Sequence, residues 1–427
     1  RQAILAIAIE AESGLTGRYD IAVSTDPQHA DMTRTYAERH LKFVLWSHGG
    51  RRIVLHGPQD LCRELEEAYS PRGARAFDCG IMQNVYGDPL EIVLASSADT
   101  VPAPRVAARP IGGHLDGCRI GFDLGASDLK VAAVRNGEAV FSTEIPWDPV
   151  PQGDPAYHYK HITEAIGLAA AKLPHVDAIG GSAAGIYINN EVKVASLFRG
   201  IPEKRFASDV KEMFRRLGDA WQVPLVIVND GDVTALAGAM SLETANLLGI
   251  AMGSSEAAGY VDAEGRITGR LNELAFAPVD MNPAAMPDEW SGDRGIGALY
   301  FSQQAVNRLL SAAGIDLPAE MSLPDRLKDV QELAENDDRR ALAIFESIGI
   351  FLGYSLEHYH DYYSYENVLL LGRVTSGAGG DVILRKARDV LKELNPGLAG
   401  SIDIHVPDEK SRRVGQAVAA ASLPALS

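Results

Sequence analysis

The sequence predicts an α/β protein whose main body forms two lobes, with a small α/β domain in front of them. Two observations lead to this prediction. A strand hairpin followed by α/β crossovers occurs twice between residues 118 and 425. Upstream of it, residues 96–117 are rich in proline, glycine and alanine and lack a sustained period, which is typical of a linker. Two copies of one design imply two lobes with a cleft between them.

Composition limits the classes of protein to consider. With 427 residues, 46% of them hydrophobic and 23% charged, the chain can bury a large core and should form about two or three domains. It contains no run of eighteen apolar residues and begins without the pattern of a signal peptide, so we expect a cytoplasmic protein with no membrane partner. Its three cysteines form no CxxC pair, which disfavours a cysteine zinc site. A net charge of −17 opposes binding to nucleic acid.

Residues 1–112 are predicted to form an N-terminal α/β extension that ends in the linker. A helix is expected at residues 59–70 because apolar residues recur there with helical spacing. No basic recognition helix follows a short turn, which argues against a DNA-binding arm. Strands are expected at residues 19–24, 42–47, 51–57 and 91–96.

Residues 113–230 are predicted to form the first lobe. It opens with three antiparallel strands, the last two joined by Asn136-Gly137, a dipeptide suited to a type I′ turn because both residues tolerate positive φ. Two α/β crossovers follow. The expected strands are 118–123, 129–134, 138–145, 176–185 and 223–230, and the expected helices lie near 159–173 and 203–217.

Residues 231–410 are predicted to form the second lobe on the same plan. A final helix near residues 411–422 is expected to complete the first lobe. The expected strands are 246–253, 257–268 and 367–372, and the expected helices lie near 296–313, 339–362 and 381–393.

The first candidate site is an acid beside a tight turn. Asp123 ends a strand, and Gly125, Ala126 and Ser127 form a turn whose backbone N–H groups can approach a phosphate closely. Asp123 would then hold Mg²⁺ through water, because this ion prefers oxygen ligands and keeps much of its hydration shell. Alone, such a turn is also compatible with a simple hairpin corner.

A second acid ends another buried strand. The run VPLVIVND finishes in Asn229 and Asp230 and passes directly into a helix. Ligands usually bind at the carboxyl ends of strands in such sheets, which makes Asp230 a candidate for catalysis. The alternative is that Asp230 only caps the helix that follows.

Two further stretches suit a nucleotide. Residues 247–267 form a strand, a small-residue turn at Gly253, Ser254 and Ser255, and a second strand, which repeats the design around Asp123. A buried strand expected over 367–372 runs through Gly372, and Ser376 and Gly377 follow before a helix begins. These glycines and serines make a suitable floor for a nucleotide, although alone they would also fit an ordinary loop.

In kind, spacing and order, these stretches resemble the ROK family of sugar kinases and repressors, within the superfamily of actin, hexokinase and the chaperone ATPases. The resemblance lies in GFDLGASDLK, VNDGDVTALAG, MGSSEAAGYVDAEGRI and residues 345–379, and it covers about residues 118–425. It implies a two-lobed, ribonuclease H-like ATPase fold that uses ATP and Mg²⁺. It also implies that Asp230 is the catalytic base and that Asn229 binds a sugar hydroxyl.

The chain departs from the family at its sugar and zinc motifs. Glu273 is kept as a sugar ligand, but Phe276 stands where the family has histidine. Ser291 and Ile296 stand where zinc-binding cysteines are expected, so no zinc site is predicted there. In the sugar-facing loop, Ser196 or Arg199 is left to contact the ligand.

Glu256 lies inside the second phosphate turn and leaves two alternatives. Its carboxylate would repel ATP if it pointed into the site, whereas pointing outward to solvent would be harmless. We favour the outward orientation.

The sequence therefore predicts an ATP-dependent kinase, a homodimer, that phosphorylates a hydroxyl of a sugar or sugar-like polyol. The alternative is a non-catalytic sugar-binding sensor on the same fold, consistent with the altered motifs. A DNA-binding repressor is disfavoured by the acidic front domain. The sequence indicates neither which sugar is bound nor what the N-terminal extension does.

Overall fold

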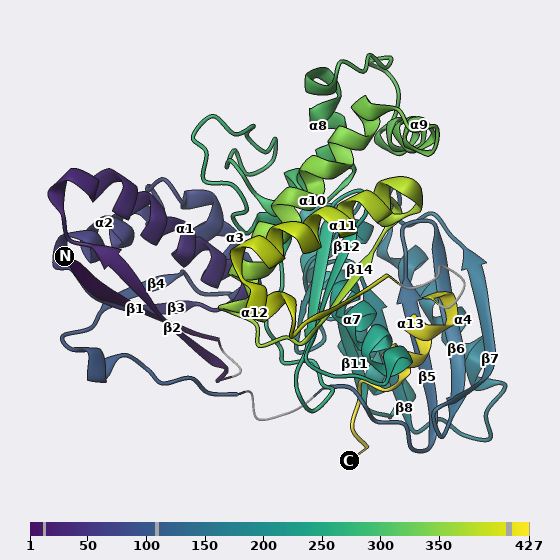
Figure 1. Cartoon of the computed structure of the whole chain (residues 1–427). Coiled ribbons are helices and arrows are strands. Elements are labelled where there is room, and N and C mark those ends of the chain that lie inside the picture. The colour runs from purple at the N-terminus through teal and green to yellow at the C-terminus, as the bar shows by residue number, and fades with distance from the viewer. Residues whose placement is uncertain (12–13, 107–110, 407–411, 427) are drawn as a thin grey trace. The chain divides into compact units, whose positions relative to one another are not determined.

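The computed structural model describes residues 1–11, 14–106, 111–406 and 412–426 (Figure 1). By its contacts the chain divides into two compact units. Unit 1 consists of Arg1–Ala108, Ile250–Ala258 and Arg270–Val406, and unit 2 consists of Arg109–Gly249, Gly259–Gly269 and Pro407–Ser427. Residues 1–108 thus belong to the same unit as residues 270–406, and the three-part division expected from the sequence stays a prediction.

Unit 2 contains a five-stranded mixed sheet in the order β11-β8-β5-β6-β7. The β5, β6 and β7 strands are antiparallel neighbours, whereas β8 and β11 run parallel to β5, as the hairpin-plus-crossover pattern predicted. Asn136 and Gly137 both have positive φ, at 50° and 84°, which confirms the turn between β6 and β7. The strands are β5 (Cys118–Leu124), β6 (Asp128–Arg135), β7 (Glu138–Pro146), β8 (Ala178–Ala183) and β11 (Leu225–Asn229).

Helices cover the sheet of unit 2, and one of them approaches it unusually closely. A Cβ on Gly121 or Gly180 would lie 1.7 or 1.6 Å from a backbone oxygen of the last helix, so only glycine allows this contact. The helices are α4 (Pro155–Ala170), α5 (Glu203–Arg205), α6 (Met213–Trp221), α7 (Asp230–Leu242) and α13 (Arg412–Ala421). The helix expected over 203–217 is interrupted by a π-helical stretch, Phe206–Val210. A small ribbon is formed by β9 (Ile186–Ile188) and β10 (Glu191–Val194).

A second sheet has the order β13-β12-β14-β15. The strand expected to reach residue 268 ends at Val261, because Asp262 accepts the N–H groups of Glu264 and Arg266 and turns the chain. The strands are β12 (Leu247–Met252), β13 (Glu256–Val261), β14 (Asn367–Leu371) and β15 (Asp403–His405). The helices that follow in sequence are α8 (Gln303–Ala313), α9 (Leu323–Glu335), α10 (Arg339–His360), α11 (Gly377–Leu394) and α12 (Pro396–Ala399).

The N-terminal residues form a four-stranded sheet in the order β2-β1-β3-β4, with three helices on one face (Figure 1). The strand expected at residues 42–47 is wrong, because this run lies in α1. Residues 39–48 are all buried, so the helix shows no polar stripe there and its apolar run resembles a buried strand. The elements are β1 (Gln2–Glu10), β2 (Thr16–Ser24), α1 (Ala30–His48), β3 (Arg52–His56), α2 (Gln59–Ala68), α3 (Ala76–Tyr86) and β4 (Glu91–Leu94).

None of the helices in the described part of the chain combines the length and the hydropathy needed to span a bilayer.

Candidate active site

Asp123 is held between two neighbouring strands of unit 2. The strand register places Lys130 opposite it on β6 and Ser182 opposite it on β8. The Ser182 hydroxyl donates to Asp123 Oδ1 at 2.7 Å, and Lys130 Nζ lies 3.2 Å from Asp123 Oδ2. Only 5% of Asp123 is exposed, so both partners fix a carboxylate that has little contact with solvent.

Lys130 contacts Asp123 in the candidate site and was not predicted from the sequence. Its Nζ also lies 3.1 Å from Asp128 Oδ1, so it bridges two carboxylates. Burial alone would lower the pKa of Lys130, but Asp123 and Asp128 outweigh it and raise the pKa above its ordinary value. The signal was present in the sequence, because a short hairpin turn between β5 and β6 puts Lys130 directly across from Asp123.

The turn between β5 and β6 is tight and exposed at its tip. Gly125 N–H donates to the carbonyl of Asp128 at 2.9 Å and closes the turn, while Ala126 and Ser127 face solvent. The Trp147 indole donates to the Gly125 carbonyl at 2.8 Å and supports the turn from below. The predicted small-residue turn therefore exists, and the acid of Asp128 stands beside it.

Asp230 is the first residue of α7, immediately after β11. The alternative that Asp230 caps this helix is wrong, because the cap is Asn229, whose Oδ1 accepts the Gly231 N–H at 2.7 Å. Asn229 Nδ2 also donates to the Gly185 carbonyl at 2.8 Å. The amide of Asn229 thus orders both the helix start and the loop after β8.

The environment of Asp230 makes it a weaker acid than an ordinary aspartic acid. Burial is the larger cause and the negative charge of Asp123 the second, and together they raise the pKa of Asp230 to about 6. The two acids predicted from separate stretches of sequence are thus electrostatically coupled. A carboxylate with this pKa is deprotonated at neutral pH yet basic enough to accept a proton.

In the loop of unit 2 that was predicted to face the sugar, the two predicted contact residues lie at the surface. Ser196 and Arg199 are both exposed, in and next to a short 3₁₀ turn, Ser196–Phe198. Beneath them, the buried His158 ring lies 3.0 Å from the Leu197 carbonyl through Nε2 and anchors the turn.

In unit 1, the second small-residue turn and the nucleotide-floor loop lie next to each other. Gly253, Ser254 and Ser255 join β12 to β13, and both serines are exposed. Gly372 follows β14 with φ of 96°, and a Cβ there would lie 2.3 Å from the Met252 carbonyl. Glycine is therefore required where this loop meets the end of β12.

A carboxylate from α9 already accepts a backbone N–H at the start of α11. Gly377 opens the helix, and Glu335 Oε1 on α9 accepts the Ala378 N–H at 2.7 Å. Beside it, the Ser376 hydroxyl donates to the Arg373 carbonyl at 2.6 Å. Glu335 was not predicted, because nothing in the sequence links α9 to this helix start.

Glu256 points inward, which corrects the favoured prediction that it faces solvent. It is 5% exposed, and neither carboxyl oxygen has a hydrogen-bond partner within the described residues. Burial, with a smaller contribution from the charge of Glu273, raises the pKa of Glu256 to about 8. A Cβ on Gly297 would lie 2.0 Å from Glu256 Oε2, so glycine makes room for the acid. At neutral pH Glu256 is mostly protonated and adds little negative charge to the turn.

The segment carrying Glu273 is attached to the N-terminal helix α1. The N–H groups of Leu271, Asn272 and Glu273 donate to the carbonyls of His48, Ser47 and Trp46, each at 3.0 Å. These are the last carbonyls of α1, which have no partner inside their own helix. The N-terminal residues therefore fix the backbone of the candidate sugar ligand Glu273.

Phe276, which stands at the position of the family histidine, joins an aromatic cluster. Its ring centroid lies 4.5 Å from that of Trp46 and 5.2 Å from that of Trp290. Ile296 is fully buried, and the Ser291 hydroxyl donates to Asp288 Oδ2 at 2.8 Å. The positions of the family's metal ligands are thus used for packing and for a turn.

The same loop is tied to the N-terminal residues by buried charges. Asp293 lies 2.5 Å from Lys42 Nζ, 3.1 Å from Arg39 Nη1 and 2.8 Å from Arg75 Nη1. Lys42 is fully buried and also lies 3.0 Å from Asp78. Burial would raise the pKa of Asp293, but Lys42 and Arg39 outweigh it and hold the pKa below its ordinary value. We call Arg39, Lys42, Arg75, Asp78 and Asp293 the charge cluster.

Comparison with known proteins gives matches at the level of structure. No family model matches the sequence, and no curated protein matches it significantly. A ROK hexokinase from Thermus thermophilus aligns with a TM-score of 0.56 and 16% identity, over 71% of this chain and 97% of its own. A ROK-family glucokinase from Streptomyces griseus, in complex with glucose and AMPPNP, aligns with a TM-score of 0.52 and 18% identity, over 70% and 98%.

A ROK-family transcriptional regulator, a homologue of the E. coli MLC protein, is also similar. It aligns with a TM-score of 0.55 and 18% identity, over 84% of this chain and 86% of its own. These identities are too low to transfer an activity, but the structural agreement covers most of each chain. The chain therefore has the fold of the ROK-family proteins, the α/β fold of actin and hexokinase type that the sequence predicted.

Proposed function

We propose that the protein is an ATP-dependent kinase that phosphorylates a hydroxyl of a sugar or sugar-like polyol. The observation that carries the proposal is the coupled pair Asp123 and Asp230, at the carboxyl ends of β5 and β11 with β8 between them. Ligands of α/β sheets bind at this edge. A pure binding protein has no chemical need for two coupled acids there.

In the proposed reaction, Asp230 accepts the proton of the attacking sugar hydroxyl. A pKa of about 6 leaves Asp230 deprotonated at neutral pH. Because the transition state of phosphoryl transfer is loose, the main task of the base is to orient the attacking hydroxyl. Asn229 keeps Asp230 in place by capping α7, which leaves the carboxylate of Asp230 for substrate.

Asp123 is the proposed metal residue. Its oxygens suit a hydrated Mg²⁺, which when bound neutralises charge on the ATP phosphates. Ser182 and Lys130 hold the Asp123 carboxylate in one orientation, and Lys130 adds a positive charge next to it. The exposed turn at Gly125, Ala126 and Ser127 would bind phosphate through the backbone N–H groups of Ala126 and Ser127, since the Gly125 N–H closes the turn.

In unit 1, the residues that we propose bind the nucleotide lie in the small-residue turn between β12 and β13 and at the start of α11. Gly253, Ser254 and Ser255 would hold phosphate, and Gly372, Ser376 and Gly377 would support the nucleotide. Protonation of Glu256 removes the repulsion that a charged acid in this turn would cause.

On the sugar side, Glu273, Asn229 and Ser196 are the proposed ligands. We propose that the N-terminal residues fix the segment that carries Glu273, in place of the structural zinc that the resemblance to the family would lead one to expect. The end of α1 holds the Glu273 backbone, and the charge cluster fixes the loop around Asp293.

The alternative is a non-catalytic sugar sensor. Two observations favour it: Lys130 already neutralises Asp123, and the regulator aligns with 84% of this chain whereas the hexokinase aligns with 71%. The acids Asp123 and Asp230 favour the kinase.

The experiment that separates the two is ATP turnover with Mg²⁺, measured as ADP release over a panel of hexoses, amino sugars and polyols. Turnover with one compound, lost in Asp230→Asn while that variant still binds the compound, supports the kinase. If no compound turns over but one raises the melting temperature of wild type and variant equally, the kinase proposal fails and the sensor replaces it.

A further inference from the structure

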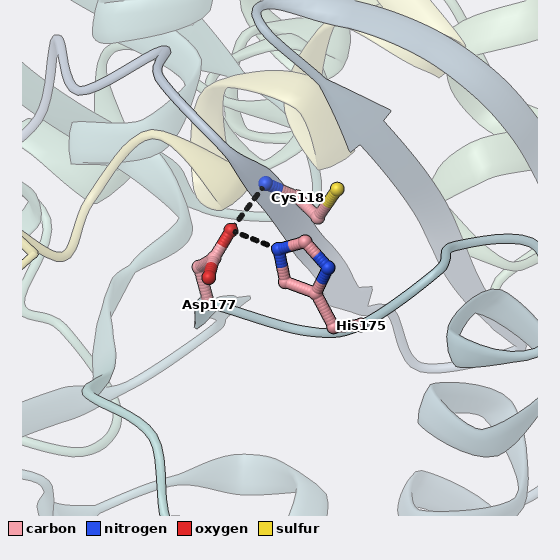
Figure 2. A group of neighbouring side chains, drawn as sticks. All are labelled: Cys118, His175 and Asp177. Carbon is pink, nitrogen blue, oxygen red and sulfur yellow. Dashed lines mark hydrogen bonds and ion pairs between the residues drawn. The ribbon is translucent and has the colours of Figure 1, made fainter.

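Three side chains of types that can bind a metal ion meet at the end of the strands of unit 2 opposite to Asp123 and Asp230. Cys118 is the first residue of β5, and His175 and Asp177 immediately precede β8, its parallel neighbour. Figure 2 shows the Asp177 carboxylate pointing at both the backbone of Cys118 and the ring of His175. None of the three residues takes part in the proposed kinase chemistry.

The distances bring one ligand atom of each residue into a small volume. Asp177 Oδ2 accepts the Cys118 N–H at 2.8 Å and lies 3.2 Å from His175 Nε2. One ligand atom from each residue, including the Cys118 sulfur, lies within 4.8 Å of the others. Gly117 leaves space beside the carboxylate, since a Cβ there would lie 2.6 Å from Asp177 Oδ2.

We propose that Cys118, His175 and Asp177 bind a divalent transition-metal ion, with zinc as the preferred ion. Thiolate, imidazole and carboxylate are the three ligand types that zinc takes in proteins, at bond lengths of about 2.0–2.3 Å. A thiolate and a carboxylate neutralise the two positive charges. Calcium and magnesium are disfavoured, because they avoid sulfur ligands.

The exposure of the three residues suits ion entry and a fourth ligand. The thiol of Cys118 is buried, whereas the His175 side chain is 63% exposed on a loop. A tetrahedral ion holds its ligand atoms about 3.3–3.7 Å apart. Asp177 Oδ2 and His175 Nε2, 3.2 Å apart, already have nearly this spacing, and all three ligand atoms lie within 4.8 Å of one another. Small side-chain movements, which the exposed position of His175 allows, would bring the set to this spacing, and water from the solvent side would complete the tetrahedron.

The ion would be structural. Asp123 lies five positions after Cys118 in β5, which at the usual rise of a strand is about 16 Å. By linking the starts of β5 and β8, the ion would stabilise the two strands whose far ends carry Asp123 and Ser182. The proposal does not depend on the kinase activity.

The test is titration of the metal-free full chain with Co²⁺ and with Zn²⁺. Cobalt serves as a probe because a thiolate ligand gives a sulfur-to-cobalt charge-transfer band. We expect one equivalent of cobalt, a band that zinc displaces, and a melting temperature that zinc raises by about 2–5 °C. The band should vanish in Cys118→Ser and persist in Cys79→Ser, a matched buried cysteine outside the site.

His175→Ala provides the second variant, because an exposed side chain can be removed without loss of folding. We expect its zinc affinity to fall at least about tenfold while its melting temperature without metal stays the same. Absence of a stoichiometric cobalt band in wild type overturns the proposal. So does a band that survives in Cys118→Ser, or zinc binding that is unchanged in His175→Ala.

Discussion

Lys130 Nζ lies 3.2 Å from Asp123 Oδ2, directly across the β5–β6 hairpin. The lysine therefore occupies the side of the carboxylate that a cation would otherwise neutralise. Removing one partner of a buried pair leaves the other charge uncompensated, which costs about 3–5 kcal/mol when the site is fully buried and less here, where Lys130 is partly exposed. Lysine and bound cation are expected to act on the same carboxylate.

Lys130→Met is expected to lower the melting temperature without Mg²⁺ and to recover part of the loss when Mg²⁺ is added. In wild type the stabilisation by Mg²⁺ should be smaller, because Lys130 already compensates Asp123. Thermal unfolding across a Mg²⁺ titration measures this difference. The control is Lys160→Met, whose exposed partner Glu164 lies 3.9 Å away. Equal responses to Mg²⁺ in wild type and Lys130→Met would contradict the assignment of Asp123 to the metal.

The pH dependence of turnover should follow the protonation of Asp230. With a pKa of about 6, kcat/KM should fall about tenfold per pH unit below pH 6, because the base becomes protonated. Asp123 raises that pKa through its negative charge, so Asp123→Asn should shift the acid limb to lower pH in whatever activity remains. Rate measurements between pH 4.5 and 8 test both statements. An acid limb at the same pH in Asp123→Asn would show that the two acids are not coupled.

Glu256→Gln should stabilise the protein at neutral and alkaline pH. The folded pKa of about 8 lies above the unfolded value, so the stability that Glu256 contributes is fully present below about pH 4.5 and is lost as the pH rises to 8. A neutral amide of the same shape has no such loss, and the difference should reach about 3–5 kcal/mol at pH 8. Denaturant unfolding from pH 5 to 9 measures it, with exposed Glu393→Gln as the control. If the difference in unfolding free energy between Glu256→Gln and wild type did not change with pH, Glu256 would not titrate in this range.

Local patterns predicted the strand ends and turns on which the candidate site residues lie. Asp123 and Asp230 were found because each ends an apolar strand, and strand order in such sheets brings carboxyl ends to one edge. Gly372 was found for a similarly local reason, since a glycine after a buried strand indicates a close backbone approach. These residues depend on short-range rules that a single sequence carries.

Residues that depend on packing between distant segments were not predictable in this way. Glu256 was expected to face solvent, because the space left by Gly297 is visible only in three dimensions. The run at residues 42–47 was read as a strand, because a fully buried helix loses the polar face that identifies it. The charge cluster joins residues more than two hundred positions apart, and no local pattern links Lys42 to Asp293.

A variant in the charge cluster tests whether the N-terminal residues position the loop around Asp293. Lys42→Met leaves Asp78 and Asp293 without their shared buried cation and should loosen the loop around Asp293. If that loop positions the sugar ligands, the KM for sugar should rise about 10-fold or more while kcat changes less than about threefold. Steady-state kinetics with saturating ATP separates the two constants.

The matched control is Arg51→Met, which removes an exposed pair with Asp88 elsewhere in the N-terminal residues and should leave both constants unchanged. A variant whose kcat falls with an unchanged KM would place the effect on the chemical step and contradict a positioning role. Asp293 still pairs with Arg39 and Arg75 in Lys42→Met, so Asp78 is the buried acid that loses its cation. The double variant Lys42→Met with Asp78→Asn removes that uncompensated charge. It should therefore recover part of the lost stability without restoring the KM, because the contact between Lys42 and Asp293 stays lost.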